Sequence, residues 1–405
     1  MGTLSVLIIG TYVPRHDGLA TFAHDLRRGM AQQEGVRVRV VAIDPAGESL
    51  RYSRNVVGRI QQGRRESFER AAQIAHQMRP DVVSIQHEFG LWGVWGQGLE
   101  ADFTHDFIAA VSSGSRPVPI VTTLHTIRPS PSDPERDVLR NIVEESAATV
   151  VMARAGAMIL ADDYGVSSRT VARIPHGVPL VSRLPRRHFK RELGLAGRTI
   201  ISTLGLLDPR KGIEYAIRAM ATVADTHPEA LYLVAGETHP SYRRTLGEQY
   251  RNELLDLVAE LGLSDNVRFV NQYLTDQEMV DYLQASDIYL TPYLDRNQIT
   301  SGTLAFAVGT GKAVVSTPNI HATEALAEGR GLIAEMRSSE SIAHCLLLLL
   351  NDLESRREME RRMAEYGRRD AWPLVGERYV DLLRRISGGG SIDDFLALEP
   401  EAITT

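Results

Sequence analysis

Lysine and cysteine are scarce in this chain. Only three of its 45 Lys and Arg residues are lysines: Lys190, Lys211 and Lys312. An ammonium group is a compact point charge whereas a guanidinium group is a planar fork, so each lysine in an arginine-rich chain is a candidate for a site that needs a point charge. The single cysteine, Cys345, excludes a disulfide framework and indicates a reducing compartment, so we expect a cytoplasmic protein.

A strong charge excess and long hydrophobic runs are also missing. The formal net charge is -6, without the basic excess that favours nucleic-acid partners. The apolar part of residues 1–10 is too short for an export signal, and Leu346–Leu350 is too short to span a bilayer. We therefore expect neither a nucleic-acid partner nor a transmembrane segment. At 405 residues, the chain is expected to form two domains.

Strand patterns alternate with helical patterns along the whole chain. This alternation predicts βαβ units and parallel sheets, which bind ligands at the carboxyl ends of their strands. The basic stretch 183–191, with prolines nearby, separates two such series and predicts a linker. The expected strands are 4–9, 36–43, 81–85, 119–124, 149–153, 158–160 and 170–174, then 199–204, 230–235, 267–270, 288–290, 313–316 and 331–334. The expected helices include 61–78, 213–227, 243–261, 275–285 and 339–362.

The fold class expected from these patterns is α/β, with two doubly wound Rossmann-like domains that face each other across a cleft. Clefts at domain junctions are preferred ligand sites. The expected boundaries are an N-terminal domain over 1–185, a C-terminal domain over 186–370, a helix over 371–388 that crosses back to the first domain, and a flexible tail over 389–405.

The stretch from Tyr289 to Pro318 has the order strand, loop, helix, strand, and Thr300-Ser301-Gly302-Thr303 lies where its helix begins. The first turn of a helix has unpaired backbone N–H groups and a positive dipole end, so it readily accepts a phosphate. A Ser-Gly pair is also an ordinary N-cap. Taken alone, the stretch leaves both interpretations open.

Other expected strands also end in polar segments. Lys211, in the segment Gly205–Gly212, is a candidate phosphate contact, and Gly18 would let the backbone approach a ligand. Tryptophans beside glycines, as in 91–96, suit a sugar ring but also suit packing. For each segment an ordinary turn, cap or packing role remains open. The further candidates are His16, Asp17, His87, Glu88, Trp92, His125, Gly236 and Glu237.

Metal and nucleophile motifs are not apparent. No Asp-x-Asp pair ends a strand, and no His, Glu or Asp cluster has the spacing of metal ligands. No G-x-S-x-G elbow or Cys/His pair is evident either. We therefore predict that no catalytic metal is bound.

Nine short segments recur in a familiar order: the loop at Gly18, Asp81-Val-Val, Thr123-Leu-His125, Ile174-Pro-His-Gly177-Val, Gly205-Leu-Leu-Asp-Pro-Arg210-Lys211-Gly212, Asn266-Val-Arg-Phe, Ala285-Ser-Asp-Ile, Gly311-Lys-Ala-Val-Val and Trp372. Their order resembles the GT-B glycosyltransferases, specifically the family-4 group of retaining, nucleotide-sugar-dependent enzymes. The resemblance extends to about residue 386.

This resemblance implies a UDP- or GDP-hexose donor, a hydroxyl acceptor and no metal. His125 would lie near the transferred sugar, and Lys211 would contact the donor diphosphate. It also assigns Gly18, Thr300, Ser301, Gly302 and Thr303 to the donor phosphates. Together with the strand-end candidates, the residues expected on the donor side are Gly18, Arg210, Lys211, Gly236, Glu237, Gln298, Thr300, Ser301, Gly302 and Thr303. Those expected on the acceptor side are His16, Asp17, His87, Glu88 and Trp92.

Three positions depart from the family pattern. Leu206 stands where the family usually has an arginine, and Gln298 and Phe306 stand where it usually has two glutamates, the second of which holds the donor ribose. Each lost charged contact is worth roughly 1.5–3 kcal/mol; Arg210 could replace the arginine and Gln298 could bind sugar hydroxyls. Two alternatives therefore stay open: a glycoside phosphorylase or sugar-1-phosphate-using enzyme on the same fold, and a non-catalytic sugar- or nucleotide-binding protein.

Overall fold

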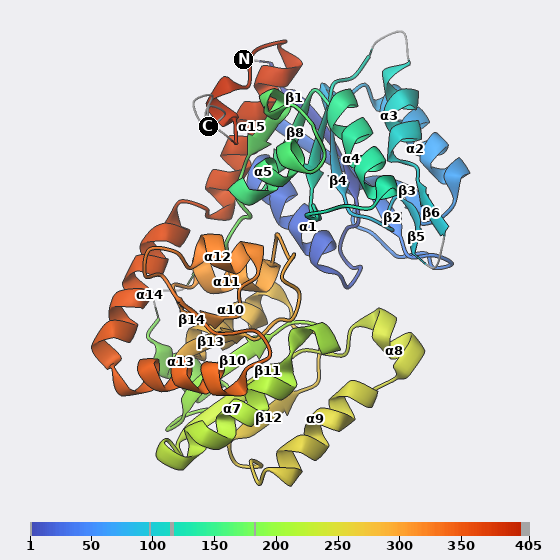
Figure 1. Cartoon of the computed structure of the whole chain (residues 1–405). Helices are drawn as coiled ribbons and strands as arrows, with labels where there is room; N and C mark the ends of the chain where they lie inside the picture. The colour runs from blue at the N-terminus through green and yellow to red at the C-terminus, as the bar shows by residue number, and fades with distance from the viewer. Residues whose placement is uncertain (1, 97–98, 114–116, 182–183, 398–405) are drawn as a thin grey trace. The chain divides into compact units, whose positions relative to one another are not determined.

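The computed structural model describes residues 2–96, 99–113, 117–181 and 184–397. The chain forms two compact units. The first comprises Met1–Gly177 and Trp372–Thr405, and the second comprises Val178–Ala371. Each unit has its own sheet and its own helices (Figure 1).

The first unit is built on a seven-stranded sheet in the order β3-β2-β1-β4-β7-β8-β9, with every neighbouring pair parallel. Its central strands are almost fully buried because helices cover both faces, which is why their sequences are continuous apolar runs. The strands are β1 (Leu4–Gly10), β2 (Val36–Asp44), β3 (Val56–Gln61), β4 (Val82–His87), β7 (Ile120–Leu124), β8 (Ala148–Val151) and β9 (Val171–Arg173). The helices are α1 (Gly18–Ala31), α2 (Arg65–Met78), α3 (Thr104–Ser112), α4 (Asp133–Glu145), α5 (Arg154–Asp162) and α15 (Trp372–Ser387).

Helix α15 packs along α1, although the two are far apart in the sequence (Figure 1). They approach closely at Gly29 and Gly376, where a Cβ built on Gly376 would lie 2.2 Å from the Gly29 carbonyl carbon. Beyond α15, Leu396 forms an antiparallel bridge with Ala172, and Ile392 is buried. The flexible tail predicted from residue 389 is therefore wrong for 391–397, because this short segment packs at the edge strand β9.

A two-stranded antiparallel hairpin, β5 (Gly93–Gly96) and β6 (Leu99–Asp102), follows β4. Just before it, Trp92 is fully buried, and its ring packs between Phe68 and Phe107 with centroids 5.5 Å from each. The tryptophan and glycine segment is therefore a hairpin attached to the core.

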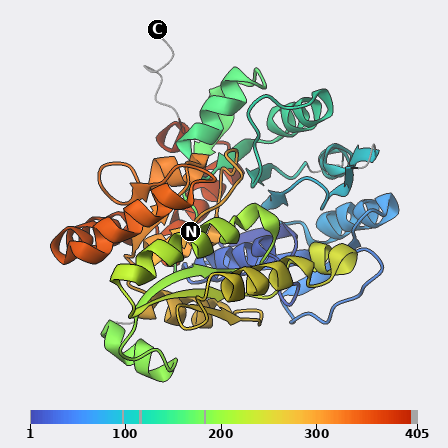
Figure 2. The same ribbon diagram turned by 60° about the horizontal axis from the view of Figure 1, so that its bottom comes forward.

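The second unit is built on a six-stranded parallel sheet in the order β12-β11-β10-β13-β14-β15. The strands are β10 (Thr199–Leu204), β11 (Ala230–Ala235), β12 (Val267–Val270), β13 (Ile288–Thr291), β14 (Ala313–Ser316) and β15 (Leu332–Ile333). Helix α7 lies beside α9, as Figure 2 shows in yellow-green and yellow. The helices are α6 (Arg186–Glu192), α7 (Ile213–Thr226), α8 (Pro240–Leu246), α9 (Gln249–Glu260), α10 (Asp276–Ala285), α11 (Gly302–Gly309), α12 (Ile320–Ala325), α13 (Ser339–Asn351) and α14 (Leu353–Arg368).

Four sequence expectations differ from these elements. Residues 158–160, predicted as a strand, lie inside α5, and most of the predicted linker 183–191 forms α6, whose Phe189 is buried. The helix predicted over 243–261 is interrupted at Gly247, where φ is +60°. The helix predicted over 339–362 divides at Asp352, because the Asp352 carboxylate accepts the Ser355 amide and begins α14.

Both sheets have a topological switch point. In the first unit the strand order reverses between β1 and β4, and in the second it reverses between β10 and β13. In doubly wound sheets, ligands bind outside the carboxyl ends of the strands at this reversal. Ligand sites are therefore expected at the loops after β10 and β13 in the second unit, and after β1 and β4 in the first.

Candidate active site

Three contacts join the loop after β10 to the first turn of α11. The Lys211 ammonium group lies 4.0 Å from the centroid of the Tyr293 ring. The Tyr293 hydroxyl is 3.0 Å from Oγ1 of Thr303, in the first turn of α11. A Cβ built on Gly205 would lie 3.0 Å from the Thr303 methyl carbon. The second unit therefore holds a lysine cation and a helix N-terminus together at its switch point.

The amides at the start of α11 are only partly satisfied by the protein. Ser301 Oγ accepts the Leu304 amide at 3.3 Å, and Nδ1 of His321 accepts the Ser301 amide at 2.8 Å. The amides of Gly302 and Thr303 make no hydrogen bond within the described part of the chain. Because these N–H groups lie at the positive end of the helix, an anion is the ligand that they fit best.

Arg210 is already paired. Its guanidinium group donates to both carboxylate oxygens of the buried Asp208, at 3.0 and 2.9 Å. Burial raises the pKa of Asp208, but the hydrogen bonds and charge of Arg210 outweigh burial and leave this pKa below its usual value. Arg210 therefore precedes Lys211 in the chain with part of its guanidinium group already hydrogen-bonded to Asp208.

The other predicted donor-side residues surround the same strand ends. Gly236 must be a glycine because a Cβ there would lie 2.0 Å from the Gly205 carbonyl oxygen. Glu237 is held by Arg243 at 3.2 Å, and the Gln298 carbonyl accepts the His321 amide at 3.1 Å. Thr300, just before the α11 cap, is partly exposed.

Gly212 keeps the loops after β10 and β13 together. It has φ +60°, and a Cβ there would lie 2.2 Å from the Pro292 carbonyl oxygen. Gly262 is a matched control, with φ +66° and no heavy atom within 4 Å of its Cβ position. Both alanine variants carry left-handed strain of about 1–2 kcal/mol.

We predict that Gly212→Ala lowers the free energy of unfolding by about 2 kcal/mol more than Gly262→Ala does, because only the first adds a steric clash. Urea unfolding of the two variants measures this difference. Equal losses would contradict the close contact between the two loops.

In the first unit, His125 follows β7 and is buried. Its Nε2 lies 3.0 Å from Oε1 of the buried Gln86, so Nε2 donates the hydrogen and Nδ1 is left as an acceptor. Phe22 contacts the His125 ring edge-on at 4.7 Å between centroids. Burial, with the neighbouring His176 and His87, lowers the pKa of His125 to about 3, so the ring is neutral near pH 7.

The loop after β1 leads to Gly18 at the start of α1. Asp17 caps this helix by accepting the Ala20 amide at 2.7 Å, and it also pairs with Arg15 at 2.6 Å. His16 is exposed, and a Cβ built on Gly18 would meet no atom within 4 Å. The described structure therefore does not itself require glycine at position 18, and the open space leaves room for a ligand.

His87 and Trp92, both predicted for the acceptor side, face the interior. His87 is fully buried, and its Nε2 lies 3.1 Å from the buried Asp102 carboxylate. The Trp92 indole donates to the Gln86 carbonyl oxygen at 3.0 Å. These contacts account for both residues by packing in the first unit.

Glu88, at the end of β4, accepts a hydrogen bond from the Thr126 hydroxyl at 2.7 Å. Burial raises the pKa of Glu88, and the Thr126 bond opposes that shift. Glu88 is therefore the predicted acceptor-side carboxylate that lies next to the His125 segment.

The position of the usual ribose-binding glutamate is filled by packing. Phe306 is 4% exposed and belongs to a core cluster with Leu204 and Tyr289. Leu206, at the usual arginine position, is partly exposed in the loop after β10.

Sequence reasoning missed Tyr293, His321 and Gln86. Each acts through a partner remote in the chain: Lys211, Ser301 and His125 respectively. No local sequence pattern identifies such pairs. The one available signal was that Tyr293 and Lys211 both lie in a segment that follows a predicted strand.

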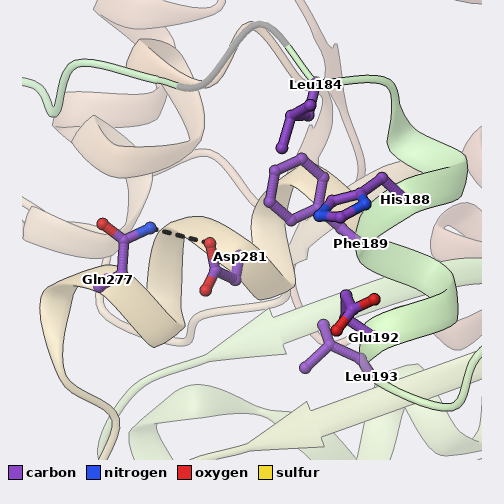
Figure 3. Close-up of a pocket in the computed structure, with 7 residues that line it drawn as sticks. All are labelled: Leu184, His188, Phe189, Glu192, Leu193, Gln277 and Asp281. Carbon is purple, nitrogen blue, oxygen red and sulfur yellow. Dashed lines mark hydrogen bonds between the residues drawn. The ribbon is translucent and has the colours of Figure 1, made fainter.

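A cavity of about 370 Å³ lies elsewhere in the second unit, between α6 and α10 (Figure 3). The residues that line it, both apolar and polar, are Leu184, His188, Phe189, Glu192, Leu193, Gln277 and Asp281. None of the predicted site residues is among them.

Among the residues that the structure describes, no group of three or more His, Cys, Asp or Glu side chains is placed to hold a metal ion. No described helix is both long and apolar enough to cross a membrane.

Two family models match this chain in tandem. Residues 16–181 match the Glycosyltransferase Family 4 model, and residues 185–370 match the model of glycosyl transferases group 1. Among solved structures, sucrose-phosphate synthase from Thermosynechococcus elongatus superposes with a TM-score of 0.76 at 16% identity, covering 95% of this chain and 100% of the other. Anabaena HepE in complex with UDP superposes with a TM-score of 0.72 at 15% identity, covering 94% and 100%.

The two doubly wound units and these neighbours define the GT-B fold, and the two family models identify the chain as a glycosyltransferase. With both family models matched in order, the chain belongs to the family-4 type of these enzymes. It is similar to the D-inositol 3-phosphate glycosyltransferase of Corynebacterium efficiens, at 26% identity over 65% of each chain. It is also similar to the GDP-mannose-dependent monoacylated alpha-(1-6)-phosphatidylinositol monomannoside mannosyltransferase of Corynebacterium glutamicum, at 23% identity over 94% of this chain and 97% of that one.

Proposed function

We propose that this glycosyltransferase is a retaining enzyme that transfers a hexose from UDP- or GDP-hexose to an acceptor hydroxyl without a metal. The observation that supports the proposal is the contact chain from Lys211 through Tyr293 to Thr303, which connects an ammonium group to the first turn of α11. A leaving diphosphate develops negative charge during transfer, and positive groups fixed at that point stabilise it.

On the donor side, Lys211 and the amides of Gly302 and Thr303 bind the diphosphate, and Ser301 and Thr300 shape the turn that presents them. Gln298 is assigned to sugar hydroxyls. Arg210 adds positive charge and offers the guanidinium N–H groups that do not donate to Asp208. Gly236 and Glu237 form the neighbouring strand end.

On the acceptor side, the first unit contributes His125, with Glu88, Asp17 and His16 as polar neighbours of the acceptor. Gly18 leaves space for the substrate at the start of α1. His125 is neutral at pH 7, so its free Nδ1 accepts a hydrogen bond from a sugar hydroxyl.

The bond between the anomeric carbon and the diphosphate oxygen breaks, and its electron pair leaves with the diphosphate. The acceptor oxygen bonds to the anomeric carbon on the same face, and its proton goes to the departing phosphate oxygen. Lys211 and the α11 amides supply the positive field that a metal supplies elsewhere. The retaining outcome rests on membership of the family-4 type.

A second candidate is a glycoside phosphorylase or a sugar-1-phosphate-using enzyme on the same fold. The buried Phe306 and the half-buried Leu206 favour it, because both remove charged contacts that normally hold a nucleotide. This alternative needs the phosphate site but no ribose carboxylate. The relatives named above are glycosyltransferases, which speaks against the non-catalytic alternative.

Ligand binding separates these candidates. A ligand that binds only the folded form raises the melting temperature, so thermal shift followed by calorimetry with UDP, GDP and inorganic phosphate is the test. We expect UDP or GDP to bind and phosphate to bind weakly. Phosphate binding without nucleotide binding supports the phosphorylase. If UDP, GDP and phosphate all fail to bind, both candidates are contradicted.

We also propose a cytoplasmic location, since the one cysteine, Cys345, forms no disulfide.

A further inference from the structure

The loop after β11 runs alongside the loop that carries Lys211. The Leu207 amide donates to the Glu237 carbonyl at 2.8 Å, and the His239 amide donates to the Leu207 carbonyl at 2.9 Å. Leu207 and Thr238 also form a parallel bridge. These backbone contacts fix His239 next to the phosphate-binding loop of the second unit.

The tautomer of the His239 ring is set by the backbone. Its Nδ1 lies 3.3 Å from the Ser241 amide nitrogen and 2.7 Å from the Ser241 hydroxyl. An amide N–H can only donate, so Nδ1 has no hydrogen and Nε2 carries it. No residue in the described ranges accepts a hydrogen bond from Nε2, and the ring is partly exposed. His239 therefore presents an unused N–H donor.

The charges around His239 are mostly positive. Burial lowers the pKa of His239; Asp208 raises it, and Arg210, Lys211 and Arg244 lower it further. The ring is therefore neutral at pH 7 and can donate from Nε2 while Nδ1 keeps its contact with Ser241. A neutral donor next to several cations fits an anionic oxygen.

We propose that His239 is a further donor-binding residue, which gives its Nε2 hydrogen to a phosphate oxygen of the nucleoside diphosphate that Lys211 holds. This inference rests on the proposed function. A hydrogen bond from His239 would help the site to bind a diphosphate although Leu206 stands at the usual arginine position. It would also compensate for Arg210, whose guanidinium group already donates two hydrogen bonds to Asp208.

Two conservative variants separate ligand binding from helix capping. His239→Asn keeps a side-chain oxygen where Nδ1 stands, so it still accepts the Ser241 amide and caps α8, but it has no donor at the Nε2 position. His239→Gln keeps an N–H near the Nε2 position and loses the capping acceptor. A purely structural role predicts that Asn is tolerated and Gln is not.

The experiment is calorimetry of UDP and GDP with the full chain at pH 7.5, together with urea unfolding of each variant. We expect His239→Asn to weaken binding of the preferred nucleotide about tenfold with unchanged unfolding, and His239→Gln to bind within about threefold of wild type. If wild type binds and His239→Asn binds equally well, the inference is overturned while the proposed function stands. If wild type binds neither nucleotide, both are overturned.

Discussion

Replacing Lys211 with methionine is expected to reduce sugar transfer by roughly 10²–10³-fold, the usual effect of removing one group that stabilises a developing anion. Methionine retains the length of the side chain and its packing over Tyr293 but has no charge. The ammonium group contributes little else to the structure, because the contact described for it is with the Tyr293 ring, whose centroid lies 4.0 Å from Nζ. The unfolding free energy should therefore fall by no more than about 1 kcal/mol.

Arg218 provides the matched control for net charge. It is exposed on α7 in the same unit, so Arg218→Met removes one positive charge away from the strand ends. Initial rates with UDP- and GDP-hexoses should be unchanged in this variant. If Lys211→Met retained wild-type turnover, or if Arg218→Met lost as much, the assignment of Lys211 to the diphosphate would be abandoned.

His125→Asn is expected to lower kcat at least about 100-fold, because the neutral imidazole beside Gln86 is assigned to the reacting sugar. The wild-type rate should show no acid limb from this residue between pH 5 and 8, since burial holds the pKa of His125 at about 3. The exposed His105 on α3 supplies the control variant His105→Asn. A pH–rate profile with a break near 6.5 that disappears in His125→Asn would contradict a neutral ring.

The same burial predicts how stability changes with pH. The unfolded chain protonates His125 near its ordinary pKa of 6.5, whereas the folded chain protonates it only near 3. The unfolded state therefore binds more protons below pH 6.5, and the free energy of unfolding falls as the pH drops. His176, whose pKa burial lowers to about 4, acts in the same direction. Urea unfolding at pH 7 and pH 5 should show a smaller loss in His125→Asn than in wild type.

Much of the fold was predictable because buried parallel strands leave a plain signal. The runs 199–204, 230–235, 267–270 and 313–316 are strands with the predicted bounds. Weaker signals failed for local reasons. Three apolar residues at 158–160 are too few to distinguish a strand from a helix, and β3, with alternate residues exposed, has no continuous apolar run.

The candidate site was predictable to the level of segments. A parallel sheet brings its strand ends to one edge, so Lys211 and Ser301 could be placed near each other from the sequence. The sequence could not show that Tyr293 connects them, because that contact depends on which strands are neighbours. The sequence also could not show whether Trp92 is buried or faces a sugar, because the same residue types are typical of both roles.

The most direct test is whether a nucleoside diphosphate contacts the start of α11. Titrating the isotope-labelled enzyme with UDP and GDP while following backbone amide resonances by NMR reports on Gly302 and Thr303 individually. We predict that the preferred nucleotide shifts both amides to saturation in wild type, and that Lys211→Met needs at least about tenfold more ligand for the same shift. Saturating nucleotide that leaves both amides unmoved would contradict the account.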